Sequence, residues 1–248
     1  MLASLSVWEL AYCAFVLTLT YAIRGTTGFG GINAPLLALV LPVTVIAPVI
    51  TFLGFISSAI ILAKDHRHAS RQALVGVMPY CAVGVALGLY FFKTLDARAL
   101  TKGLGVMVIL YGLFSMWVSF RPPVAPKRPS AGLNCLMGAG GGFVGTMFGS
   151  MAGVFFAIYV HVLKLDKAAF RATCAALLTV LGVMRGAGYV AIGAFGPDTL
   201  ALCLAALPVA ALGMWIGNFI HHSVSPVAFT RVVAGLFIVS GMPLLVKG

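Results

Sequence analysis

The chain has 248 residues, of which 61% are hydrophobic and only 8% charged, with a mean hydropathy of +1.09. This composition is too apolar for a water-soluble domain, so a membrane protein is predicted. The net charge of +11 is attributed to short basic loops that obey the positive-inside rule, and not to nucleic-acid binding. Five scattered cysteines without CxxC spacing indicate neither a metal site nor a disulfide framework, and nothing in the chain calls for a cofactor.

Long apolar runs predict an all-α fold, a polytopic transmembrane helix bundle. A helix needs about 20 apolar residues to cross the hydrocarbon layer. The candidate runs, in chain order, are 6–23, 44–63, 73–92, 103–120, 131–148, 167–190, 198–219 and 227–246. Two shorter apolar pieces, 32–41 and 153–163, are only about 15–17 Å long at 1.5 Å per residue. That is roughly half a bilayer, as expected for broken helices.

A glycine-rich turn precedes each short piece. The first covers residues 24–33 and the second residues 140–153, with Gly149 and Gly153 at its end. Irregular backbone at membrane depth survives only where protein buries it or where it lines a wet cavity. One such break in each half of an apolar chain is typical of a transporter's central binding site.

The chain also repeats itself, which predicts two related halves. A shift of 122 positions superposes Gly31 on Gly153 and the predicted N-cap Thr44 on the predicted N-cap Asp166. A shift of 129 positions aligns further pairs without a gap, namely Pro79 with Pro208, Gly84 with Gly213, and Gly88 with Gly217. We therefore expect an internal duplication, with a first transmembrane repeat over 1–120 and a second over 131–248. The stretch 121–130, with four prolines and three cations, is predicted to be an extended cytoplasmic linker.

Loop charges predict that the two repeats are inverted. If each short piece counts as a crossing, each half has five segments, and only Lys93, Arg98 and Lys102 fall on the outer side. The cytoplasmic side then receives Lys64, Arg67, Arg71, Arg121, Lys127, Arg128, Lys164, Lys167, Arg171 and Arg231. If the short pieces are not crossings, the split is six against seven and carries no bias. The first arrangement follows the positive-inside rule, and it places both chain ends away from the cytoplasm.

These motifs are where the chain resembles the sulfite exporter TauE/SafE family. In the first half the resemblance lies in the segment 28–31, followed by Pro35, and in the Leu41–Pro42 pair. In the second half it lies in the Gly149/Gly153 turn and in the segments 165–166 and 170–172. The resemblance extends over about residues 8–245. It implies a small bacterial inner-membrane protein that moves sulfite, sulfonates or other small organosulfur anions.

The first turn and its counterpart are predicted to form one anion site. Glycines expose successive backbone N–H groups, and the N-terminus of a helix attracts anions. The predicted substrate-binding residues of the two turns are Thr26, Thr27, Gly28, Gly30, Gly31, Asn33, Gly149, Ser150 and Gly153. The alternative is that these glycines only permit close helix crossing, and for Gly140–Gly142 that alternative is equally good.

Two arginines complete the predicted site. Arg24 closes the first long helix beside the turn, where the alternative is an interfacial arginine whose head group reaches the lipid headgroups. Arg185 lies inside the apolar run 167–190 with no carboxylate near it in sequence. An arginine at that depth is costly unless it faces a cavity or a partner.

The sequence therefore predicts a secondary transporter or exporter of small anions, including sulfite, sulfonates and carboxylates, in the inner membrane. Its partners are the anionic substrate, the lipid bilayer and either a coupling proton, a sodium ion or neither. No embedded carboxylate pair and no catalytic motif is present, which argues against an enzyme. The alternatives are an anion channel and a non-transporting membrane scaffold.

Overall fold

The computed structural model describes residues 6–27, 31–120, 130–219 and 226–247, and these residues form helices and no strand. Every run predicted as a long helix is helical, which confirms the all-α prediction. The helices are α1 (Val7–Thr27), α2 (Asn33–Leu37), α3 (Val43–Asp65), α4 (Arg71–Thr94), α5 (Ala97–Ser119), α6 (Ala131–Phe148), α7 (Ala152–Val162), α8 (Lys167–Ala191), α9 (Pro197–Phe219) and α10 (Pro226–Lys247), with a 3₁₀ turn, η2 (His66–His68), between α3 and α4.

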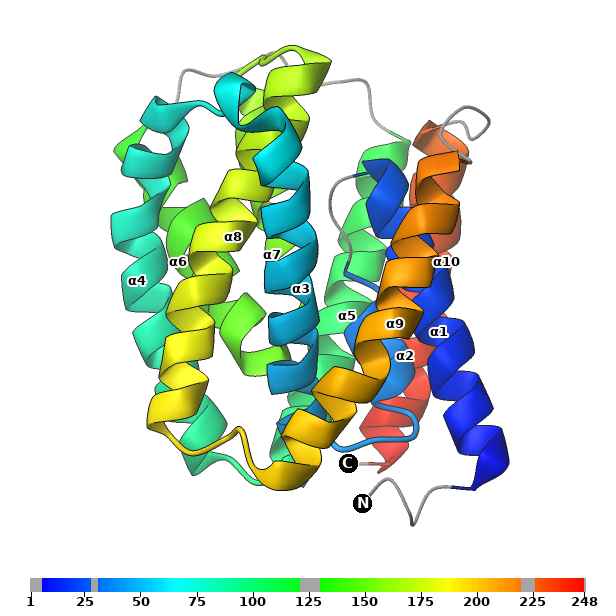
Figure 1. Ribbon diagram of the computed structural model, residues 1–248. Coiled ribbons are helices and arrows are strands. Elements are labelled where there is room, and N and C mark those ends of the chain that lie inside the picture. Colours follow the sequence, from blue (N-terminus) through cyan, green and yellow to red (C-terminus); the bar gives the residue numbers. More distant parts are fainter. Residues whose placement is uncertain (1–5, 28–30, 121–129, 220–225, 248) are drawn as a thin grey trace.

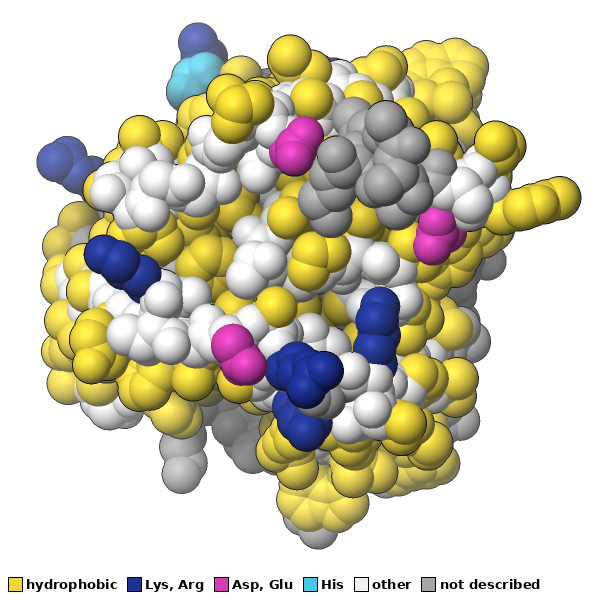
Figure 2. Space-filling view, turned by 90° about the horizontal axis from the view of Figure 1, so that it is seen from below, with side chains coloured by type: hydrophobic (Ala, Val, Ile, Leu, Met, Phe, Trp, Pro, Cys, Tyr) yellow, Lys and Arg dark blue, Asp and Glu magenta, His cyan; other side chains and the backbone are white. Residues whose placement is uncertain are grey.

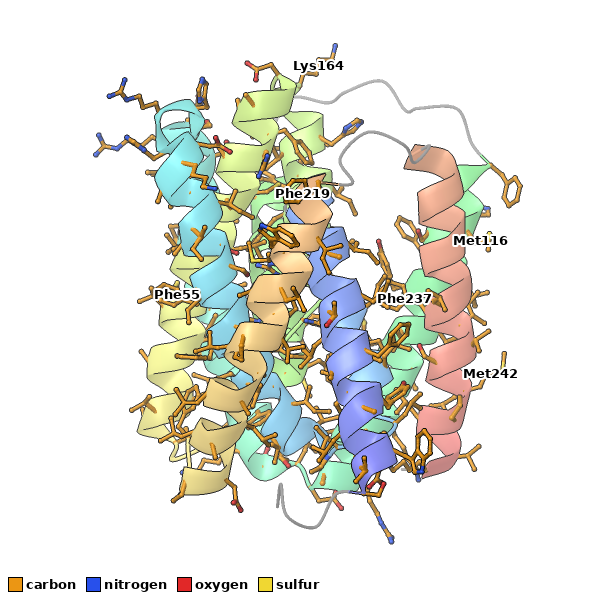
Figure 3. The ribbon with its side chains drawn as sticks, turned by 45° about the vertical axis from the view of Figure 1, so that its right-hand side comes forward. Phe55, Met116, Lys164, Phe219, Phe237 and Met242 are labelled. Atoms are coloured by element: carbon orange, nitrogen blue, oxygen red, sulfur yellow. The ribbon has the colours of Figure 1, made fainter. Side chains whose placement is uncertain are left out.

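Several of these helices have the length and composition of membrane spans. Within the described part of the chain, six helices are long and apolar enough to cross a bilayer: α1, α3, α4, α5, α8 and α9. Their outward faces carry large apolar side chains, as a surface in contact with lipid requires. Met242 of α10, a further exposed apolar side chain, also points outward (Figure 3).

The two short helices differ from each other more than the sequence indicates. Helix α7 matches its predicted bounds, but α2 covers only residues 33–37 of the predicted 32–41. The residues after α2 form turns up to Leu41, which precedes the extended Pro42. After Leu37 the backbone continues in turns, since Leu39 N and Val40 N bond carbonyl oxygens three residues earlier, and Pro42 keeps the residue before it out of the helical region.

Helices of the two halves pack against one another in matching pairs. Helix α1 packs on α9 and α4 packs on α6, while α3 packs on α8 and α5 on α10. Exchanging the halves turns the α1–α9 pair into the α4–α6 pair and leaves the α3–α8 and α5–α10 pairs unchanged. Figure 1 shows α1 starting at the lower end of the molecule, whereas α6 starts at the upper end. This arrangement agrees with an inverted duplication, which remains a prediction, as do the domain bounds; the linker 121–130 lies, except for Ser130, outside the described residues.

The glycines paired by the shift of 129 are contact points of corresponding helix pairs. A Cβ at Gly84 would lie 2.2 Å from the Ala139 carbonyl oxygen of α6. At Gly213 it would lie 2.5 Å from the Thr18 carbonyl oxygen of α1. Both distances forbid any side chain, so backbones touch in the α4–α6 and α1–α9 pairs, as small residues permit in lipid.

The loops separate into two ends with different charges. The α3–α4 and α7–α8 connections lie at the upper end, while α1 begins and α10 ends at the lower end (Figure 1). At the upper end lie described cations from the predicted cytoplasmic set, among them Lys64, Arg67 and Lys164, the last labelled in Figure 3. Figure 2 shows that the lower face carries both basic and acidic side chains within a large apolar rim. The predicted N-cap Asp166 is confirmed, since its carboxylate accepts a hydrogen bond from Ala169 N at 2.8 Å.

Candidate functional site

The second glycine turn is a sharp, strained link between α6 and α7. Gly149 ends α6 with φ +73, and Met151 precedes α7 with φ +70. A left-handed conformation is costly for a residue with a Cβ, so Met151 stores strain here. A Cβ on Gly149 would also lie 2.5 Å from the Ala47 Cα of α3. Position 149 therefore requires glycine for two reasons: its backbone is left-handed, and the α3 backbone leaves no room for a Cβ.

The first turn meets the second one directly. The Ser150 hydroxyl donates to the Gly31 carbonyl oxygen at 3.2 Å, and a Cβ on Gly31 would lie 3.6 Å from Met151 Cα. Phe237 of α10 points inward from a third side (Figure 3). Its Cζ would lie 3.8 Å from a Cβ on Gly31. The backbone angle φ of Gly31 is not positive, so its conformation does not require glycine, unlike that of Gly149.

Some predicted residues of this region cannot be placed. Gly28 and Gly30 lie outside the described residues, and so do the side chains of Thr26 and Thr27, although their backbone ends α1. Asn33 is 4% exposed, and its Oδ1 accepts from Ala34 N at 3.1 Å. Gly153 lies in the first turn of α7 and is buried.

Arg24 is a buried residue tied to α3 and not an interfacial one. Its side chain is 6% exposed. One terminal nitrogen donates to the Gly54 carbonyl oxygen at 3.1 Å and to the Ser58 hydroxyl. The Nε has no hydrogen-bond partner among the described residues. The alternative in which Arg24 reaches the lipid headgroups is therefore wrong in this conformation.

Arg185 is the matching cation of the second half. It is 4% exposed, and one terminal nitrogen donates to the Gly145 carbonyl oxygen of α6. Its Nε is also without a hydrogen-bond partner in the described structure. Tyr189, one turn further along α8, donates to the Thr146 carbonyl oxygen, so α8 is tied to α6 at two successive carbonyls.

A single small cavity joins these parts. Both arginines line it, together with parts of both glycine turns and apolar side chains from α3 and α8. Its wall consists of Arg24, Asn33, Ile50, Gly54, Gly149, Ser150, Met151, Ala152, Gly153, Leu178 and Arg185. The sequence prediction that the two turns and Arg185 lie around one space thus has a structural counterpart, although Gly31 contacts Met151 and does not itself line the cavity.

The cavity carries positive charge without a carboxylate to offset it. No acidic side chain lines it, and all five acidic residues of the chain lie in the described part without being buried. Guanidinium groups stay protonated in proteins, and removing two of them from water is costly unless they meet opposite charge or strong acceptors. Backbone carbonyls supply part of that compensation, and an anion between the arginines would supply the rest.

Sequence reasoning missed the acceptors that hold the arginines. Gly54 and Ser58 lie in an otherwise apolar helix, where the Ser57–Ser58 pair was the available signal. Nothing in the sequence marked the Gly145 carbonyl. Gly140 and Gly142, in contrast, serve the packing alternative: a Cβ on Gly142 would lie 2.5 Å from the Cys81 carbonyl oxygen of α4, and one on Gly140 would lie 2.9 Å from Phe155.

Two comparisons with known proteins find similar sequences. The model of the family "Sulfite exporter TauE/SafE" matches residues 13–244. The chain is 29% identical over 189 residues to the protein named "Probable inner membrane transporter protein TsaS" of Comamonas testosteroni, an overlap that covers 73% of this chain and 74% of that one. No solved structure matches the chain.

Proposed function

Because this chain belongs to the TauE/SafE sulfite exporter family of inner-membrane transporters, we propose that it is a secondary transporter of small oxyanions. The substrate class comprises sulfite, sulfonates and related organosulfur or carboxylate anions. The substrate binds between the two glycine turns, in the cavity that both arginines line.

One observation carries the proposal: Arg24 and Arg185, from opposite halves, line one cavity, and each keeps an unpartnered Nε. Each arginine donates a hydrogen bond from a terminal nitrogen to a backbone carbonyl oxygen, and this bond fixes the position of its side chain. The Nε–H of each remains to bind an acceptor that the described protein does not provide. Hydrogen bonds from ionised donors to anionic oxygens are about twice as strong as neutral ones, so an oxyanion suits this place.

The start of α7 supplies further donors. Its first backbone N–H groups have no acceptor within the helix, and Ala152 and Gly153 belong to the cavity wall. Helix α7 has 11 residues, enough for its N-terminal dipole to favour an anion. Helix α2, with five residues, contributes the Asn33 side chain to the wall.

The proposed mechanism is alternating access by movement of one half against the other. Each arginine ties the helix before a break to the helix after it within its own half: Arg24 joins α1 to α3, and Arg185 joins α8 to α6. Each cation is therefore fixed between two helices of its own half. The halves also pack along the α1–α9, α4–α6, α3–α8 and α5–α10 pairs, so the motion slides these pairs against one another, while the hydrogen bond between Ser150 and Gly31 can break and remake.

Anion flux into proteoliposomes tests the function. Radiolabelled sulfite, a short sulfonate and acetate are offered to wild type, to Arg24→Gln and to Arg185→Gln. The exposed Arg67→Gln of η2 serves as the matched control. We expect saturable flux in wild type and in the control, and a roughly 10- to 100-fold loss of kcat/KM in either cavity variant, since a hydrogen bond to a charged group contributes about 1.5–3 kcal/mol.

The alternatives predict other results. A carrier shows counterflow, in which unlabelled anion inside the vesicle accelerates uptake of labelled anion, and a channel does not. Flux that is unchanged in both cavity variants would contradict the site, and absence of anion flux in wild type would contradict the function.

A further inference from the structure

A third polar group beside the two arginines has no partner in the described structure. Tyr21 of α1 is 1% exposed, and its hydroxyl makes no hydrogen bond among the described residues. A buried hydroxyl without a partner is destabilising, and phenylalanine would fill the same space without that cost. The hydroxyl of Tyr21 thus contributes no hydrogen bond to the stability of the described structure.

Other tyrosines at the helix interfaces of this chain are different. The Tyr12 hydroxyl donates to the Leu36 carbonyl oxygen at 3.0 Å, Tyr189 donates to Thr146, and Tyr111 is hydrogen-bonded to Ser115. Buried tyrosines usually find such partners. Tyr21 departs from that pattern, and it does so beside two charged groups that also have unpartnered N–H donors.

The position of Tyr21 is fixed by its neighbours. Its ring centroid lies 6.0 Å from the Arg24 Cζ, and a Cβ on Gly213 of α9 would come within 3.0 Å of the Tyr21 Cβ. Tyr21 is therefore held against α9 next to Arg24, a residue of the cavity wall, and does not itself belong to that wall.

We propose that the Tyr21 hydroxyl is a third donor to the transported anion and favours head groups with three oxygens. This inference rests on the proposed function of the cavity. Two arginine Nε–H groups match the two oxygens of a carboxylate. A sulfite or sulfonate head group has a third oxygen, pointing out of the plane of the other two, and Tyr21 supplies a donor from another helix for it. The neutral hydroxyl adds this bond without adding charge.

The test is Tyr21→Phe, which removes only the oxygen and keeps the ring beside Arg24. We expect KM for sulfite and for methanesulfonate in proteoliposomes to rise roughly tenfold, the factor that one lost hydrogen bond to an anion produces. KM for acetate should change by less than about twofold. The matched control is Tyr111→Phe on α5, whose hydroxyl bonds Ser115 outside the cavity wall and whose loss should leave all three KM values unchanged.

Thermal melting of the purified protein in detergent gives a second readout. Without anion, Tyr21→Phe should melt at or above the wild-type temperature because the lost hydroxyl had no protein partner. Sulfite should then raise the melting temperature of the variant less than that of wild type. If wild type transports sulfite and the variant has the same KM for all three anions, the inference is overturned and the proposed function stands. If wild type neither transports nor is stabilised by any of the anions, the proposed function itself fails.

Discussion

The two glycine turns border the same cavity but differ in structure. In the second half, α6 turns at Gly149 through two left-handed residues and continues as α7, which has 11 residues. In the first half, α1 is followed by α2, which has only five. The arginines differ too: Arg24 lies on the helix before its break, and Arg185 on the helix after its break.

This difference teaches that the two halves supply the same kind of side chain to the cavity from different places in the chain. The shift of 122 that superposes the turns places Arg24 on Thr146, a neutral residue. Yet each arginine bonds a carbonyl of the partner helix in its own half and lines the shared cavity. Each half thus provides one positive charge to the cavity, from positions that the repeat does not superpose.

Replacing glycine by alanine should destabilise the protein much more at the second turn than at the first. Gly149→Ala combines a left-handed φ with a clash against the α3 backbone, and we expect a loss of about 3–5 kcal/mol, the sum of backbone strain and overpacking. Gly31→Ala meets only an ordinary contact at 3.6 Å and should cost less than about 1 kcal/mol. Thermal unfolding in detergent measures both. Equal losses would show that the first turn is as constrained as the second.

The two arginines should act on one anion. Arg24→Gln and Arg185→Gln each lower kcat/KM for sulfite, and we expect the double variant to lose less than the product of the single losses, with a coupling of about 1–2 kcal/mol. The coupling arises because the second arginine contributes little once the anion has lost the first. Combining either variant with Arg67→Gln should show no coupling. Independent effects of the two arginines would indicate two separate binding places.

The hydrogen bond between the turns should contribute modestly. Ser150→Ala removes the donor to the Gly31 carbonyl oxygen and is expected to cost about 1 kcal/mol in the melting assay. Its control is Ser240→Ala, an equally buried serine that bonds the Phe237 carbonyl oxygen of its own helix at 3.2 Å. Since that bond joins no separate elements, the loss should be smaller. A larger loss at Ser240 would argue against a role for the contact between the halves.

The end of α2 should be locally sensitive where α7 is not. Both helices are closed by backbone bonds of the residue after them, Ala38 and Leu163. The end of α2 is held in addition by side chains, since Lys247 donates to the Leu39 carbonyl oxygen at 2.7 Å and Tyr12 donates to the Leu36 carbonyl oxygen. Lys247→Met should cost about 0.5 kcal/mol, the effect of one exposed cation at a helix end, and should speed amide hydrogen exchange in residues 36–41. Lys247→Arg should keep the protection. Unchanged exchange in Lys247→Met would mean that Tyr12 alone holds α2.

The sequence predicted the helices well and the site only in outline. Apolar length fixes transmembrane helices because lipid leaves no other solution for the backbone, and the predicted runs agree with the structure. The length of α2 was wrong because the pattern of apolar residues continues to Leu41, while the backbone after Leu37 forms turns; apolar residues are equally suited to a buried helix and to buried turns. The Gly54, Ser58 and Gly145 acceptors had no sequence signature, since a backbone carbonyl looks the same at every position.

By itself, the sequence determined a helical membrane protein of the TauE/SafE family with a glycine turn in each half. Those features depend on composition and on local backbone chemistry, which a single chain displays directly. Only the tertiary structure decided that Arg24 and Arg185 line one cavity and that Tyr21 stands beside them without a partner. Those residues come from α1 and α8, and their meeting depends on how the helices of the two halves pack, which no local pattern encodes.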